Sequence, residues 1–196
     1  LHYPLRRQRQ MCIRDSPEID LQLLPDIGLA DVAGGEVDVA IRYGRGTWPG
    51  VRARRLMPER LSVVCAPALV AGKRRPRTPD DLLRYPLLAS HTKHPFEWDA
   101  WARRFGLDLG RAQTVRLHDY NIVVEAALAG QGLAMGRHRM IAAQLASGAL
   151  VQALPDTVLE DARIGWWFIS PRGKVNDTAQ AFHAWLADAA ASDSTH

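Results

Sequence analysis

Few residues of this chain have the types and spacing that catalysis or metal binding requires. His91 and His94 have a three-residue spacing, but they lie in a proline-flanked loop without a third ligand. No serine lies in a G-x-S-x-G motif, and Cys65 lies inside an apolar strand, where a thiol is inert. No carboxylate pair has the apolar setting that acid–base catalysis needs. We therefore expect no enzymatic activity, no cofactor and no bound metal.

Two glycine pairs could suggest a nucleotide-binding loop. The pair Gly44-x-Gly46 runs into Trp48-Pro49 rather than into a helix. The pair Gly130-x-Gly132 follows a predicted helix and precedes a strand, which reverses the order that phosphate binding uses. Neither pair predicts a nucleotide site.

Arginines and a helix start supply the chemistry for binding a ligand. Arg42 ends a buried strand, where its planar guanidinium could bind a carboxylate, although pairing with Asp38 or another acid explains it equally. Backbone N–H groups at the helix start near Asp119 attract anions, but Asp119 as the N-cap occupies one of them. Asn121, with a donor and an acceptor, is the better ligand contact. Arg137 is a second candidate for a carboxylate.

Charge and composition describe a soluble globular chain. Lys and Arg number 25 against 21 Asp and Glu, and four arginines with one acid give residues 1–16 most of the net +4. No helix-turn-helix pattern is present, so this chain alone is not expected to bind DNA. Two cysteines exclude a disulfide scaffold, and no apolar run could span a membrane. Without a secretory signal, we expect a cytoplasmic location and no membrane partner.

Strand and helix patterns alternate from Pro17 onward, whereas residues 1–16 have neither period. This atypical basic arm is either a solvated segment or an artefactual, foreign junction, and we favour the second interpretation. This order implies parallel sheets, and two small sheets with a cleft fit better than one six-stranded sheet. The predicted strands are 19–24, 37–41, 61–66, 86–89, 115–117, 133–135, 150–154 and 163–170. The predicted helices are 29–34, one beginning at 78, 98–105, 120–129, one around 141–145, and one beginning at 176 or 177.

Four stretches in series match recurring phrases of one protein family. They are DVAIRYGRGTWPG (38–50), LSVVCAPAL (61–69), TPDDLLRYPLL (78–88) and HDYNIVVEAALAGQGLAMG (118–136). Together they resemble the effector-binding domain of LysR-type transcriptional regulators, in the subgroup of the glycine-cleavage and β-lactamase regulators. Each phrase is weak alone, but four in the right order are specific.

The resemblance implies an α/β fold with two Rossmann-like lobes of the type II periplasmic-binding-protein fold. Lobe one is expected at 17–64 and 169–191, truncated at its N-terminus, and lobe two at 65–168, before a tail at 192–196. The family's helix-turn-helix is absent here, so the parent protein would contact DNA through that missing part. The family also forms a side-by-side dimer through the helix at 120–129 and edge strands, which implies a homo-oligomer, either a dimer or a tetramer.

The resemblance also implies a small-molecule effector, such as a carboxylate, held between the lobes, where it would shift their relative angle. Trp48 could contact this ligand or could cover the core instead, and Asp26 could simply form a turn. A periplasmic-type solute-binding protein and a small α/β enzyme remain alternatives. Matching to the family gives as ligand-binding candidates Asp26, Ile27, Arg42, Tyr43, Thr47, Trp48, Asp119, Tyr120, Asn121, Met135 and Arg137.

Overall fold

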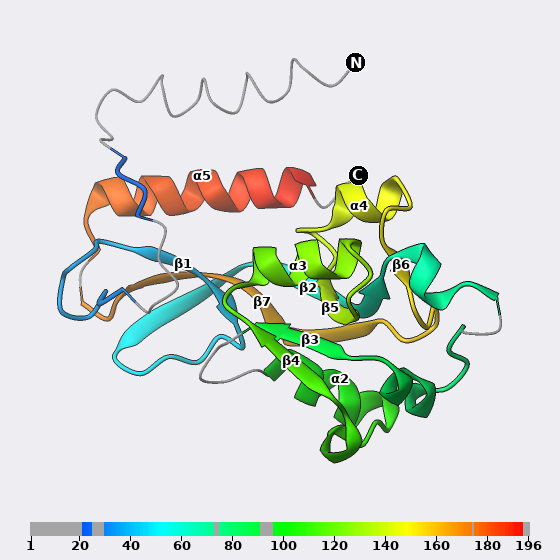
Figure 1. Ribbon diagram of the computed structural model, residues 1–196. Helices are drawn as coiled ribbons and strands as arrows, with labels where there is room; N and C mark the ends of the chain where they lie inside the picture. The colour runs from blue at the N-terminus through cyan, green and yellow to red at the C-terminus, as the bar shows by residue number, and fades with distance from the viewer. Residues whose placement is uncertain (1–20, 25–29, 73–74, 91–95, 174, 194–196) are drawn as a thin grey trace. The chain divides into compact units, whose positions relative to one another are not determined.

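Two long strands, β2 (Val51–Cys65) and β7 (Leu159–Pro171), organise the chain (Figure 1). The computed structural model describes residues 21–24, 30–72, 75–90, 96–173 and 175–193. Its contacts divide the chain into unit 1, within Leu1–Met57 and Trp166–His196, and unit 2, Pro58–Gly165. Strands β2 and β7 therefore each contribute residues to both units. The lobe boundaries expected from the sequence stay a prediction.

The strands form one mixed sheet in the order β1-β7-β2-β5-β3-β4, with β6 also paired to β2. Strand β3 is parallel to β4 and β5, whereas β2 is antiparallel to β5 and β6. The pairing is therefore mixed rather than purely parallel as predicted, and β2 extends far beyond the predicted 61–66. The shorter strands are β1 (Ala40–Gly44), β3 (Leu87–Ser90), β4 (Thr114–Leu117), β5 (Leu133–Arg137) and β6 (Val151–Gln152).

Helices form where the apolar spacing predicts them in unit 2. Helix α2 (Phe96–Phe105) buries the stripe that contains Trp98 and Trp101, and α3 (Tyr120–Leu128) begins at the predicted N-cap Asp119. Thr78 forms a capping box with Asp81 at a 3₁₀ helix rather than an α-helix. The remaining helices are α4 (Ala142–Ala146), α5 (Asp177–Asp193) and the 3₁₀ helices Pro67–Val70, Pro79–Arg84 and Leu109–Arg111.

The start of the described chain departs from the prediction. Residues 32–35 form turns instead of the helix expected at 29–34, because the Asp31 side chain accepts a hydrogen bond from Gly34 N at 2.6 Å. Residues 21–24 form no strand, and β1 begins at Ala40 rather than at position 37. The predicted segment 1–16 and the candidates Asp26 and Ile27 lie outside the described residues.

The core of unit 2 lies between its strands and α3, which is drawn above β3 and β4 while α2 is drawn below them (Figure 1). Val64, Leu88, Ala127 and Ala134 are each at most 1% exposed and belong to one apolar cluster. Cys65, next to this cluster in β2, is fully buried, and burial raises the pKa of its thiol to about 11. This packing fixes the ends of β3 and β5, where the candidate site lies.

Gly136 shows how closely β5 approaches its neighbours. A Cβ atom at this position would lie 2.6 Å from Ile141 Cδ1 and 2.8 Å from Val64 Cγ1. A larger residue would therefore push β5 away from β2. The glycine keeps its two neighbours, Met135 and Arg137, at a defined place at the strand end.

Candidate functional site

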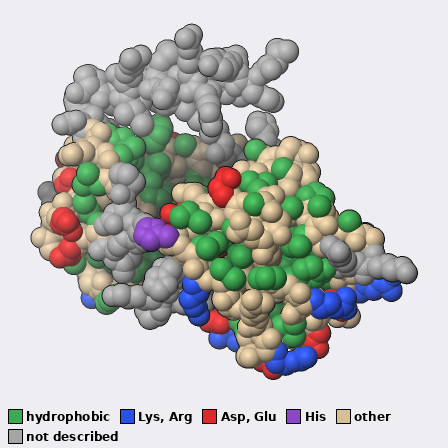
Figure 2. Space-filling model, in the orientation of Figure 1, with side chains coloured by type: hydrophobic (Ala, Val, Ile, Leu, Met, Phe, Trp, Pro, Cys, Tyr) green, Lys and Arg blue, Asp and Glu red, His purple; other side chains and the backbone are tan. Residues whose placement is uncertain are grey.

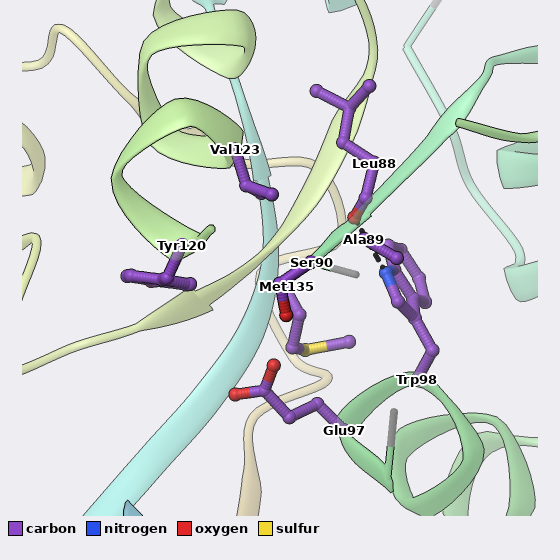
Figure 3. Close-up of a pocket in the computed structure, with 8 residues that line it drawn as sticks. All are labelled: Leu88, Ala89, Ser90, Glu97, Trp98, Tyr120, Val123 and Met135. Carbon is purple, nitrogen blue, oxygen red and sulfur yellow. Dashed lines mark hydrogen bonds between the residues drawn. The ribbon is translucent and has the colours of Figure 1, made fainter. Parts of the chain in front are cut away.

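A pocket in unit 2 lies where β3 and β5 end and where α2 and α3 begin (Figure 3). The pocket is small: the space that water-sized molecules can occupy in it is about 10 Å³. The parallel pairing of β3 and β5 brings their carboxyl ends to the same edge, the usual place for a ligand in such sheets. The lining residues are Leu88, Ala89, Ser90, Glu97, Trp98, Tyr120, Val123 and Met135.

The walls of this pocket are largely apolar and fixed by hydrogen bonds. Trp98 Nε1 donates to the Leu88 carbonyl at 2.9 Å, the dashed contact in Figure 3. Met135 is 2% exposed, and its side chain lies between Glu97 and Ser90 in the same view. Among the described residues that line the pocket, Glu97 carries a charge, and its carboxylate points toward Met135 and Tyr120 (Figure 3).

Arg137 and Glu97 form a shielded ion pair beside the pocket. Arg137 Nε donates to Glu97 Oε1 at 2.7 Å, and Nη2 donates to Oε2 at 3.4 Å. Their side chains are only 12% and 13% exposed. A bidentate pair with so little solvent holds both side chains in one geometry. Arg137 is therefore charged and oriented, but its partner is a carboxylate of the protein.

Tyr120 supports Arg137 in two ways. The guanidinium carbon lies 3.9 Å from the centroid of the Tyr120 ring, within cation–π range. The Tyr120 hydroxyl accepts a hydrogen bond from Arg137 N at 2.7 Å. Burial raises the pKa of Tyr120 well above its ordinary value, although the bond from Arg137 opposes this. The hydroxyl thus stays protonated, and its proton can be donated to an acceptor in the pocket.

Three consecutive backbone N–H groups, at the end of β5 and in the turn after it, donate hydrogen bonds. Arg137 N donates to Tyr120, His138 N to the Arg60 carbonyl at 3.0 Å, and Arg139 N to Glu59 Oε1 at 3.1 Å. Glu59 is 2% exposed. The His138 ring also contacts Ser62 Oγ at 2.7 Å, and burial lowers the pKa of His138, with Arg60 adding to the effect. The strand end that carries Arg137 is therefore rigid.

The start of α3 is occupied by its own cap. Asp119 Oδ1 accepts hydrogen bonds from Asn121 N at 2.8 Å and Ile122 N at 3.1 Å. These bonds lower the pKa of Asp119, against a smaller effect of burial. Asn121 is exposed, and neither it nor Asp119 is among the described residues that line the pocket. The helix start therefore presents fewer free donors to an anion than the sequence alone suggests.

Two candidates of unit 1, Arg42 and Trp48, lie next to each other. Arg42 Nη2 donates to the Ala30 carbonyl at 2.5 Å, and its guanidinium carbon lies 6.0 Å from the Trp48 ring. Burial lowers the pKa of Arg42, while the charge of Asp31 opposes the shift. Arg42 forms no ion pair with Asp38 within the described ranges. Arg42 is thus held by a neutral carbonyl and a ring.

Aromatic packing accounts for the other candidates of unit 1. Tyr43 lies 5.2 Å from Trp166, and Trp48 meets Trp167 edge-on at 6.5 Å, measured between ring centroids. Trp167 Nε1 donates to the carbonyl of Gly44 at 3.1 Å. This packing favours the reading in which Trp48 covers other side chains. Thr47 is exposed.

The structure thus gathers Tyr120, Met135 and Arg137 at one pocket of unit 2. Sequence reasoning missed Glu97, since an acid in the first turn of a helix ordinarily complements the helix dipole. Its partner is 40 residues away, so no local signal connects the two. The described ranges hold no cluster of three His, Cys, Asp or Glu residues that could bind a metal. In the same ranges no helix is both long enough and apolar enough to cross a bilayer.

Comparison with known proteins identifies the family. Residues 8–191 match the family model of the LysR substrate binding domain. The glycine cleavage system transcriptional activator of Escherichia coli is 34% identical over 144 residues, which cover 73% of this chain and 47% of that protein. The HTH-type transcriptional activator AmpR of Pseudomonas aeruginosa is 32% identical over 178 residues, covering 89% of this chain and 57% of that protein.

A solved structure agrees with both relatives. The effector domain of the transcriptional regulator AmpR of Pseudomonas aeruginosa has a TM-score of 0.77 and 30% identity, covering 97% of this chain and 89% of that one. The fold is therefore the α/β effector-binding fold of this class of regulators, of the periplasmic-binding-protein type, as the sequence predicts. The chain belongs to the LysR substrate-binding domain family. It spans about half the length of the curated relatives it matches.

Proposed function

We propose that this chain senses a small-molecule effector for a LysR-type transcriptional regulator, and that the unit 2 pocket receives at least part of that effector. The single observation that carries the proposal is the pocket at the ends of β3 and β5, lined by Tyr120 and Met135 beside Arg137. Apolar walls with a few fixed polar groups are the usual composition of a small-molecule site. The named relatives are transcriptional activators, which favours sensing over solute transport.

The proposal is binding without turnover. The pocket presents a carboxylate already paired with Arg137, a protonated tyrosine and apolar side chains. None of these is an activated nucleophile. Binding would act by favouring one of two conformations, and its effect is limited by the difference in affinity for the two. The regulator's DNA contacts would lie in a helix-turn-helix of the parent protein, in the cytoplasm where DNA is available.

The regulator would act as a homo-oligomer, a dimer or a tetramer. Strand β4 ends the strand order, so its outer edge has no partner among the described strands. Hydrophobic side chains are exposed on the visible face of the molecule (Figure 2). Among the described residues of unit 2, Val115 of β4 is 36% exposed and Ile122 of α3 is 44% exposed. An edge strand next to exposed apolar residues is a common surface for association. Analytical ultracentrifugation with Val115→Asp tests this edge.

A thermal-shift screen of metabolites, followed by calorimetric titration of each hit, tests the sensing function. Ser90→Leu fills the pocket and should abolish the binding of a true effector. Ser147→Leu is the matched control, because Ser147 is an exposed serine after α4 in the same unit. The proposed site is wrong if Ser90→Leu binds every hit as tightly as Ser147→Leu does.

A further inference from the structure

A buried hydroxyl group contacts a histidine ring between β2 and the turn that follows β5. Ser62 of β2 is 0% exposed, and its Oγ lies 2.7 Å from His138 Nε2. The backbones are hydrogen-bonded at the same place, because His138 N donates to the Arg60 carbonyl at 3.0 Å. Ser62 also lies opposite Gly136 in the antiparallel register of β2 and β5. The Ser62–His138 contact thus connects the end of β5 to β2 through side chains as well as through the backbone.

The burial of Ser62 fixes the direction of this hydrogen bond. A serine hydroxyl has one proton to donate, and a fully buried hydroxyl cannot donate it to bulk water. Among the described residues, Ser62 Oγ has one hydrogen-bond partner, His138 Nε2. The hydroxyl is therefore satisfied as a donor only when Nε2 accepts its proton. This requires a neutral His138 that carries its own proton on Nδ1.

Protonation of His138 reverses the contact. Both ring nitrogens of an imidazolium are donors, so Nε2 can then only donate to Ser62 Oγ. The hydroxyl proton loses its acceptor within the described part of the chain, and a buried donor without an acceptor is unfavourable. The neutral ring satisfies both members of the contact, whereas the charged ring leaves the Ser62 hydroxyl proton unsatisfied.

The surroundings of His138 also favour the neutral ring. Burial lowers the pKa of His138, Arg60 adds to this effect, and Glu160 opposes it. Glu160 is itself paired with Arg60, with 2.9 Å between Glu160 Oε1 and Arg60 Nε. The other charged groups of the turn and of the adjoining part of β2 are Glu59, Arg137 and Arg139. The positive groups outnumber the negative ones, so a further positive charge on His138 is disfavoured.

We propose that Ser62 and His138 form a proton-sensitive latch between β2 and the end of β5, closed while His138 is neutral. When acidification protonates His138, the latch opens and the turn at 138–140 separates more readily from β2. The residue before this turn is Arg137, so the strand end beside the unit 2 pocket becomes less fixed at low pH. The inference concerns the fold of unit 2 and holds whether or not the proposed sensing function does.

Nitrogen NMR of the isotope-labelled chain tests the closed latch. Long-range proton–nitrogen spectra distinguish the two neutral forms of a histidine ring, and the signals that vanish in His138→Gln belong to His138. A free histidine prefers the proton on Nε2, so a proton on Nδ1 is a specific signature of the contact. We expect the Nδ1–H form of His138 in the wild type at about pH 7.5. The Nε2–H form, or an imidazolium at this pH, overturns the inference.

Native-state hydrogen exchange tests the opening. The backbone N–H groups of His138 and Arg139 report on the turn, and those of Leu87 and Leu133 report on hydrogen bonds elsewhere in unit 2. Between about pH 7.5 and pH 5.5, after correction for intrinsic exchange rates, protection of the turn should fall at least about tenfold more than that of the reference groups. An equal change in both sets, or no change in either, overturns the inference.

His138→Gln removes the titrating ring but keeps a side chain that can form hydrogen bonds. In this variant the turn should lose its extra dependence on pH. His183→Gln is the matched control, because burial also lowers the pKa of His183, which lies in unit 1. His183→Gln should keep the pH dependence of the turn within about twofold of the wild type. If the extra dependence survives in His138→Gln, or disappears in His183→Gln, another group binds the proton and the inference is wrong.

Discussion

Arg42 in unit 1 and Arg137 in unit 2 have the same expected role, a guanidinium in or at the end of a strand that could bind a carboxylate. The structure gives them different partners. Arg42 contacts the Ala30 carbonyl and the Trp48 ring, and burial disfavours its charge. Arg137 has a carboxylate partner in Glu97. Two arginines with the same expected role therefore differ in the charge of their partner, which is neutral for Arg42 and negative for Arg137.

Removal of Glu97 should produce the largest effect. Glu97→Ala removes the carboxylate that holds the shielded Arg137 through two hydrogen bonds, so the free energy of unfolding should fall by about 3–5 kcal/mol in urea denaturation followed by circular dichroism. Adding Arg137→Met should restore much of the loss, because both charges are then absent. If Glu97→Ala lowers the free energy of unfolding by less than about 1 kcal/mol, as for an exposed ion pair, solvent or another group screens the charge of Arg137.

Removal of the Tyr120 hydroxyl should have an intermediate effect. Tyr120→Phe leaves Arg137 N without its acceptor, and the same denaturation experiment should show a loss of about 1–3 kcal/mol. The ring that packs under the guanidinium is kept, so the Glu97 pair should survive. An unchanged free energy of unfolding would show that water replaces the hydroxyl.

Removal of Arg42 should cost less than removal of Glu97. Arg42→Met loses one hydrogen bond to a neutral carbonyl and breaks no ion pair among the described residues, so we expect a loss of about 1 kcal/mol by denaturation. If this variant is as damaging as Glu97→Ala, the contrast between the two units is wrong.

Two histidines extend the comparison to pH. Burial is the main cause that lowers the pKa of both His138 in unit 2 and His183 in unit 1, with Arg60 and Arg54 adding to it. The unfolded chain then binds a proton more readily, so stability is lost as pH falls through the ordinary histidine pKa, about 6.5, toward the folded one.

The effect should be larger for His138, which is more deeply placed and contacts Ser62. The free energy of unfolding of His138→Gln should therefore vary less with pH than that of the wild type, and His183→Gln should change this dependence less. The measurement is a series of urea titrations between about pH 7.5 and pH 5. A larger change in this pH dependence for His183→Gln than for His138→Gln would contradict the prediction.

Local chemistry made part of this structure predictable. The Asp119 cap and the Trp98 and Trp101 stripe depend on neighbours within one helix, and both are confirmed. The helix expected at 29–34 is wrong, because the Asp31 side chain competes with helical hydrogen bonds. The extra length of β2 was not predictable, because Arg52, Arg54 and Arg55 read as a polar surface segment rather than a strand.

The candidate site was predictable only where one partner is local. Tyr120 and Arg137 each stand at an element end that the sequence marks, but their contact bridges 17 positions. Glu97 and Glu59 reach the same turn from 40 and 80 positions away. Pairings of this kind arise from tertiary packing, which no periodicity encodes. The ligand-binding roles of the predicted residues stay a prediction that the titrations above decide.

The reactivity of the buried Cys65 thiol can measure how often unit 2 opens. A pKa of about 11 leaves almost no thiolate while β2 is packed against its neighbours. Iodoacetamide can then alkylate Cys65 only after the strand becomes exposed, so the alkylation rate reports how often this part of the structure opens. A bound effector that stabilises the packed strand would slow this alkylation, and peptide mass analysis separates Cys65 from Cys12.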